Sequence, residues 1–174
     1  ASSVVPIITV DLESDPVANG WAQGLAHPGR NISGVFLDLP DFSGKCLQIL
    51  REAVPGLLKV GILWHPAVGN VQLQAVQNAA ASLGMTLAVF KVAAPADFDG
   101  AIRAMSQQEA RGAMMLSSPL FSANSRLLAY LVQQIRLPAI SLFPEFAEEG
   151  GLLAYGPDLQ VLFRQAGTMT RKVL

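Results

Sequence analysis

Residues that could contact a small molecule gather in four proline-marked turns, each directly after a short apolar run. They share a small polar, aromatic or acidic side chain beside the proline, in Ser14-Asp15-Pro16, Trp64-His65-Pro66, Ser117-Ser118-Pro119-Leu120-Phe121 and Phe143-Pro144-Glu145-Phe146. Aromatic faces stack on planar ligands, serine hydroxyls and N–H groups at helix starts bind carboxylates, and acidic side chains bind amines. None of the four turns holds an acid, a base and a nucleophile together, so the pattern favours recognition over catalysis.

The alternative interpretation is that the same residues have a purely structural role. A proline after a strand can simply end it, and Phe121, Phe143 and Phe146 can pack in the core. His27 and His65 each precede a proline, where the backbone is extended or turned. His65 also follows a buried strand, where open α/β sheets bind ligands, and it is the one sensible general base if the chain is an enzyme.

Motifs for phosphate, metal or covalent chemistry are missing from the sequence. It contains neither common glycine-rich phosphate loop, no Cys/His spacing typical of a metal site and no nucleophile elbow. The single cysteine, Cys46, excludes an internal disulfide framework and suits a small buried residue of a helix. We therefore expect no cofactor, no metal and no catalysis.

The composition indicates a protein with much buried surface. Of 174 residues, 51% are hydrophobic and 14% are charged, with a mean hydropathy of +0.39, and strands buried on both faces of a parallel sheet explain that bias. The net charge is -1 and Lys and Arg are scattered, which argues against nucleic acid as a partner. No apolar run reaches the length of a membrane-spanning helix.

Alternating strand and helix patterns must position the four turns. Buried apolar runs predict strands, and apolar residues at i, i+3, i+4 and i+7 predict helices. The expected strands cover 4–10, 32–37, 60–64, 86–92, 112–116, 138–143 and 152–155. The expected helices cover 17–26, 43–54, 71–83, 97–108, 125–135 and the segment after Asp158. Repeated strand–helix units with right-handed crossovers predict an α/β fold with a doubly wound parallel sheet.

Several segments, in this order, resemble a known protein family: VPIITV, SDPVANGWAQGLAHPGRNISGV, SGKCLQILREAVPGLLKVGILWHPA, SSPLF and LPAISLFPEFAEEGGLLAYGPDL. They are similar to the substrate-binding proteins of bacterial ABC transporters, whose members include binders of tryptophan and other aromatic amino acids. The resemblance covers nearly the whole chain. It implies the type I periplasmic binding protein fold, in which two doubly wound lobes hold a ligand between them, with one lobe nearly complete here and the other partial.

The resemblance also implies how the chain is divided. Residues 1–38 form part of the first lobe, residues 39–153 form the second lobe, and residues 154–174 form a helix that returns to the first lobe. Opening strands of the first lobe and a C-terminal stretch would then lie outside the chain. Uncovered sheet edges in the partial lobe favour a homodimer.

The function that the resemblance implies is the non-catalytic solute-binding component of an ABC-type importer. It would trap an amino acid, an aromatic compound or a carboxylate compound in the interlobe cleft and dock on a membrane permease, in a periplasmic or otherwise extracytoplasmic location. The alternative is a ligand-sensing domain or a small α/β enzyme that uses the same strand-end turns.

The resemblance also implies which residues contact the ligand, wherever a motif of the family matches this sequence. The matching positions are Asp15, Pro16, Trp64, His65, Ser118, Pro119, Phe121, Glu145 and Tyr155, to which the strand-end turns add Ser14 and Phe143. Three positions depart from the commoner form, because His65 stands where Asn or Asp is frequent, Ser118 where Asp is frequent and Ala154 where Ser is frequent. Without an acidic group at Ser118, we expect a ligand other than a standard amino acid.

Overall fold

The computed structural model describes residues 5–11, 15–37 and 39–173 and divides the chain into two compact units. Unit 1 comprises Ala1–Asp38 and Pro157–Leu174, and unit 2 comprises Leu39–Gly156. Each unit has a parallel sheet of its own.

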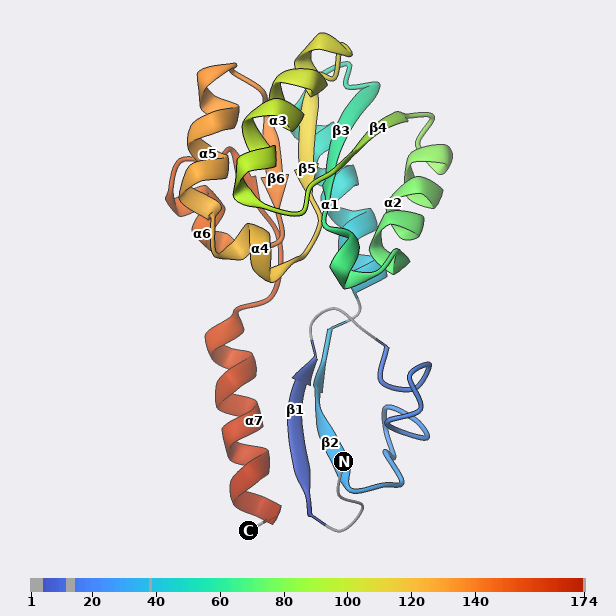
Figure 1. Cartoon of the computed structure of the whole chain (residues 1–174). Coiled ribbons are helices and arrows are strands. Elements are labelled where there is room, and N and C mark those ends of the chain that lie inside the picture. The colour runs from blue at the N-terminus through green and yellow to red at the C-terminus, as the bar shows by residue number, and fades with distance from the viewer. Residues whose placement is uncertain (1–4, 12–14, 38, 174) are drawn as a thin grey trace. The chain divides into compact units, whose positions relative to one another are not determined.

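Unit 2 is built on a sheet of five strands in the order β4-β3-β5-β6-β7 (Figure 1). The strands are β3 (Lys59–Trp64), β4 (Thr86–Lys91), β5 (Gly112–Met115), β6 (Ala139–Ser141) and β7 (Leu153–Ala154). Every neighbouring pair is parallel. Helices lie on both faces of this sheet in Figure 1, with α3 in front and α1 behind. The prediction of an α/β fold with a doubly wound parallel sheet is confirmed.

Four longer helices carry most of the connections in unit 2. They are α1 (Leu39–Ala53), α2 (Val71–Ser82), α3 (Phe98–Gln107) and α5 (Ser125–Gln134), and the shorter elements are α4 (Pro119–Ser122), α6 (Pro144–Glu148) and the 3-10 turns η1 (Pro66–Val68) and η2 (Pro95–Asp97). Helix α1 packs on α2, and α3 packs on α5. Across the part of the chain that the structure describes, no helix is long and apolar enough to cross a membrane.

The core of unit 2 explains why its strands are so apolar. Strand β5 is buried along its whole length and β3 along its four central residues, as expected for strands covered on both faces. The predicted stripe of α3 is buried through Phe98, Ile102 and Met105. One cluster joins it to buried side chains of the strands and the other helices, among them Leu63, Ala113, Met115, Phe121, Leu128, Val132 and Phe146.

Unit 1 is a smaller α/β arrangement. Strands β1 (Ile7–Asp11) and β2 (Ile32–Phe36) pair in parallel, with Ile7 opposite Ile32. Helix α7 (Leu159–Val173) contacts both strands. Asp158 caps this helix, because its Oδ1 accepts the N–H groups of Gln160 and Val161 at 2.8 and 3.1 Å. No residue of α7 that the structure describes is buried, so its apolar face is only partly covered within unit 1.

The predicted helix over 17–26 is wrong. One turn forms and then stops, because Gly20 adopts φ +70°. The Gly20 N–H donates to the carbonyl of Val17 and the Trp21 N–H to that of Pro16, both at 2.9 Å. This pair of bonds is the Schellman arrangement that ends helices, so the chain continues as turns and bends.

Packing at Gly61 in β3 generates a stability prediction. A methyl group there would lie 2.5 Å from Cγ and Sδ of Met105, which is fully buried. We expect Gly61→Ala to lower the free energy of unfolding by about 1–3 kcal/mol, because the core must shift. The control is Gly100→Ala in α3, where a methyl group meets open space and should raise stability by about 0.5–1 kcal/mol. Urea denaturation measures both changes, and a Gly61→Ala protein as stable as Gly100→Ala would contradict the expectation.

Candidate functional site

The strand order of unit 2 reverses between β3 and β5. From β3 the chain continues to β4 on one side, and from β5 it continues to β6 on the other side. In open α/β sheets ligands bind in the crevice outside the carboxyl ends of the strands at such a reversal. The residues at this place, here called the switch-point site, are His65, Gln72, Ser117, Ser118 and Phe121.

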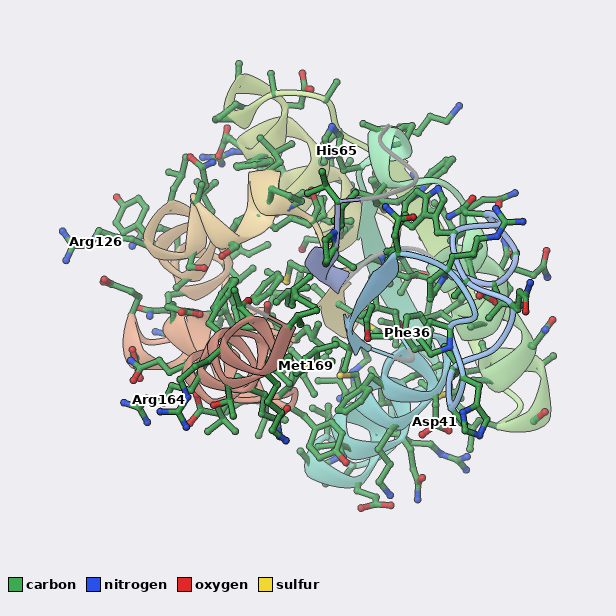
Figure 2. The ribbon with its side chains drawn as sticks, turned by 90° about the horizontal axis from the view of Figure 1, so that it is seen from below. Phe36, Asp41, His65, Arg126, Arg164 and Met169 are labelled. Carbon is green, nitrogen blue, oxygen red and sulfur yellow. The ribbon has the colours of Figure 1, made fainter. Side chains whose placement is uncertain are left out.

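A hydrogen bond between His65 and Ser118 joins the two sides of this site. His65 Nδ1 lies 2.8 Å from Ser118 Oγ, although the residues are 53 positions apart in the chain. The same Oγ accepts the Leu120 N–H at 3.1 Å and so caps α4. A neutral His65 can therefore accept the serine proton at Nδ1 and carry its own proton on Nε2. Among the described residues Nε2 has no hydrogen-bond partner, so in this tautomer it offers one N–H donor after β3. His65 is labelled in Figure 2.

Gln72 fixes the loop that carries Ser118, and sequence reasoning missed it. Its Oε1 accepts the Ser117 N–H at 2.7 Å, and its Nε2 donates to the Ser117 carbonyl at 3.1 Å. The side chain is buried, at 3% exposure. A signal was present, since Gln72 lies one turn before Val76 on the apolar stripe of α2, where a polar residue needs a buried partner.

Trp64 is half-buried at the end of β3 and is held on two sides. Its Nε1–H donates to the Gly69 carbonyl at 2.8 Å, across the turn that follows the strand. Lys91, its register partner on β4, places Nζ 5.5 Å from the centroid of the indole ring. This cation–π contact gives the edge a positive charge next to an aromatic surface.

The predicted phenylalanines are part of the core. Phe121 and Phe143 are 1% and 4% exposed. The Phe121 ring lies 5.9 Å from that of Phe98 and 6.5 Å from that of His65, centroid to centroid. Phe121 therefore supports the His65 ring from below the surface. Pro119 is exposed at the start of α4, and Glu145 is exposed in the first turn of α6.

Tyr155 follows β7 and is 40% exposed. Its ring lies 5.9 Å from that of Phe42, and its carbonyl accepts a hydrogen bond from Cys46 Sγ at 3.3 Å. Burial of Cys46 raises the pKa of its thiol to about 12. The thiol is thus an inert part of the packing beneath Tyr155.

Unit 1 holds the other predicted site residues. Asp15 Oδ1 accepts the N–H groups of Val17 and Ala18 at 2.8 and 3.1 Å, so this carboxylate caps its own turn. Pro16 is buried. Ser14 lies outside the described residues.

A cavity of about 730 Å³ opens inside unit 1 between β2, the turns that follow Pro16, and α7. Its lining is mainly apolar, with Phe36 and Met169 among the side chains, and Arg164 and Lys172 add positive charge (Figure 2). Pro16 lines it as well. The side chains that the structure describes in unit 1 therefore leave much of its interior unfilled.

The His65–Ser118 pair suits binding better than covalent chemistry. A serine beside a histidine can act as a nucleophile when the hydroxyl is accessible and a third group orients the base. Ser118 is 0% exposed and its Oγ already caps α4, and no carboxylate among the described residues is hydrogen-bonded to His65. The described residues also contain no group of three or more His, Cys, Asp or Glu side chains that could hold a metal ion.

The family model for the ABC transporter substrate binding protein matches residues 1–174. The chain belongs to this substrate-binding protein family. Its fold is similar to an ABC domain from Streptococcus pneumonia solved in complex with L-Trp, at a TM-score of 0.85 and 18% identity, with 99% of this chain and 58% of that chain covered. No curated protein sequence matches the chain.

Two further solved structures share the fold of this substrate-binding protein. A conserved domain protein from Vibrio cholerae has a TM-score of 0.84 and 18% identity over 99% of this chain and 57% of that chain. A ligand-free, open substrate binding protein with adhesive properties from Clostridium difficile has a TM-score of 0.71 and 21% identity over 99% and 58%. The chain thus spans less than two thirds of these proteins, and at such identities the likeness concerns the fold.

Removal of the buried amide tests the role of Gln72 in this substrate-binding protein. Gln72→Ala deletes both hydrogen bonds to Ser117 and leaves a cavity, so we expect the free energy of unfolding to fall by about 2–3 kcal/mol. Gln74→Ala on the same helix is the control, because Gln74 is exposed and its side chain bonds only Asn78 among the described residues. Its effect should stay within about 0.5 kcal/mol. Equal effects in urea denaturation would show that the Gln72–Ser117 pair contributes nothing.

The buried thiol of Cys46 predicts a pH-dependent stability. Its folded-state pKa of about 12 lies above the ordinary value of 9.0, so the native protein holds this proton more tightly than the unfolded chain does. The contribution is complete below pH 9 and is lost as the pH rises toward 12. We expect the free energy of unfolding to fall over this range in the wild type, and less steeply in Cys46→Ala. Parallel pH profiles of the two proteins would contradict this expectation.

Proposed function

We propose that the protein is the non-catalytic solute-binding component of an ABC-type importer. It binds a small organic ligand, namely an amino acid, an aromatic compound or a carboxylate compound, in the cleft between two lobes. Membership of the substrate-binding family supports this role. The observation that carries it is the His65–Ser118 hydrogen bond, because it holds a free donor at the reversal of strand order, where ligands of α/β sheets bind.

Unit 2 supplies one wall of the proposed cleft. Trp64 offers an aromatic surface, and His65 offers a polar group that the buried Ser118 holds in place. Pro119, Phe121 and Phe143 shape the edge around them. Glu145 and Tyr155 are exposed after β6 and β7 on the same carboxyl edge of the sheet. Asp15 and Pro16 of unit 1, with Ser14, are proposed for the opposite wall.

Closure of the two lobes couples binding to transport in this proposal. A ligand held by both walls stabilises the closed state, and a membrane permease that docks on that state receives only loaded protein. The description of the Clostridium difficile protein as ligand-free and open is consistent with such a cycle in that protein. The role requires a periplasmic or otherwise extracytoplasmic location.

An aromatic ligand is the first class to test. The protein from Streptococcus pneumonia was solved with L-Trp, and Trp64 gives this chain an aromatic group beside its own candidate site. We also propose a homodimer in which uncovered sheet edges of unit 1 pair with a second copy of the chain.

Thermal melting of the full-length protein tests the proposed function. Aromatic amino acids and aromatic acids, each added singly, should raise Tm, because a ligand at 100 times its Kd stabilises the folded state by about 2.7 kcal/mol. A screen of these compounds without any shift would argue against a solute-binding role for this ligand class.

The Trp64→Ala variant locates the binding in the same experiment. It should reduce the ligand-induced shift while the unliganded protein stays folded, since Trp64 is only half-buried. Tyr130→Ala is the matched control, because Tyr130 is an aromatic residue of α5 that is 56% exposed. Phe121→Ala is unsuitable, because loss of this core side chain should itself cost about 3–5 kcal/mol.

A further inference from the structure

The turns at the reversal of strand order carry hydrogen-bond donors and no carboxylate. The segments 65–70 after β3 and 116–124 after β5 contain no Asp or Glu. Their polar side chains include those of His65 and Ser118, joined at 2.8 Å. The adjoining strand β4 ends at Lys91, whose Nζ lies over the Trp64 ring. The local electrostatics therefore favour an anion.

The acidic groups on this edge follow other strands than β3 and β5. Asp97 follows β4, but its Oδ2 accepts the N–H groups of Ala93 and Ala94 at 2.8 and 3.0 Å, and these bonds lower the pKa of its carboxyl. Glu145 follows β6, which lies two strands from β3 in the sheet. At the usual strand spacing that is roughly 10 Å, so one ligand group cannot meet both His65 and Glu145.

Two acceptors of the switch-point site are already engaged. Ser118 Oγ accepts the Leu120 N–H and shares a proton with His65, and the Ser117 carbonyl accepts from Gln72. An ammonium group placed here would lose water and gain no carboxylate partner from the turns after β3 and β5. A carboxylate would gain a charge-assisted hydrogen bond from His65 Nε2–H.

We infer that the β3–β5 edge of unit 2 receives the carboxylate end of the ligand through His65 and discriminates against an amine at that position. The inference rests on the proposed function and narrows its ligand class to organic carboxylates, for which an α-amino group is not required. Trp64, beside this position on β3, then provides the aromatic contact for the rest of the ligand.

Calorimetric titrations of the full-length protein with three indole compounds test the carboxylate and the amine of the ligand separately. Indole-3-propanoate has the carboxylate alone, tryptamine has the amine alone, and tryptophan has both. Because a hydrogen bond to a charged group is at stake, we expect indole-3-propanoate to bind at least about tenfold more tightly than tryptamine. His65→Gln should remove most of this preference, and His27→Gln, at the exposed second histidine, should leave it unchanged.

The outcomes distinguish the inference from the proposed function. Tryptamine binding as tightly as indole-3-propanoate, binding of tryptophan alone, or an undiminished preference in His65→Gln would overturn the carboxylate assignment and leave the solute-binding role intact. Failure of all three compounds to bind would count against both. The comparison of carboxylate with amine uses wild-type protein, so it remains decisive if His65→Gln does not fold.

Discussion

The reversal of strand order between β3 and β5 is the constraint on which the candidate site depends. The connections after these strands diverge, and in open α/β sheets ligands bind at the carboxyl edge where this happens. Two side-chain interactions span this reversal, Gln72 with Ser117 and His65 with Ser118. Each joins the segment after β3 to the segment after β5, so the same contacts hold the diverging connections together and fix the polar groups between them.

Local sequence patterns predict the elements of unit 2 because those elements are amphipathic or fully buried. The stripe of Phe98, Ile102 and Met105 is an example. The same patterns identify His65 and Ser118 as candidates, yet they cannot predict the hydrogen bond between them. That bond requires β3 and β5 to be neighbours, and strand order is set by packing across the whole sheet.

Unit 1 illustrates the opposite case, in which a local signal overrides an apolar stripe. Trp21 and Leu25 have helical spacing, but Gly20 closes a Schellman turn before them, and they remain 41% and 61% exposed. Their exposure, the uncovered face of α7 and the cavity of about 730 Å³ have a common cause. The described part of unit 1 has two strands and one long helix, which do not provide enough side chains to fill a layered core, and the chain spans 58% of the Streptococcus pneumonia protein.

The fixed serine favours binding over nucleophilic catalysis. Ser118 is buried, caps α4 and bonds His65. Its oxygen is therefore fixed in position and inaccessible to an electrophile. The same bonds, with the edge of Phe121 beneath, restrict rotation of the imidazole before any ligand arrives. A donor ordered in advance loses little conformational freedom on binding, so more of its interaction energy appears as affinity. A rigid polar group on an apolar core is thus suited to recognise one end of a ligand.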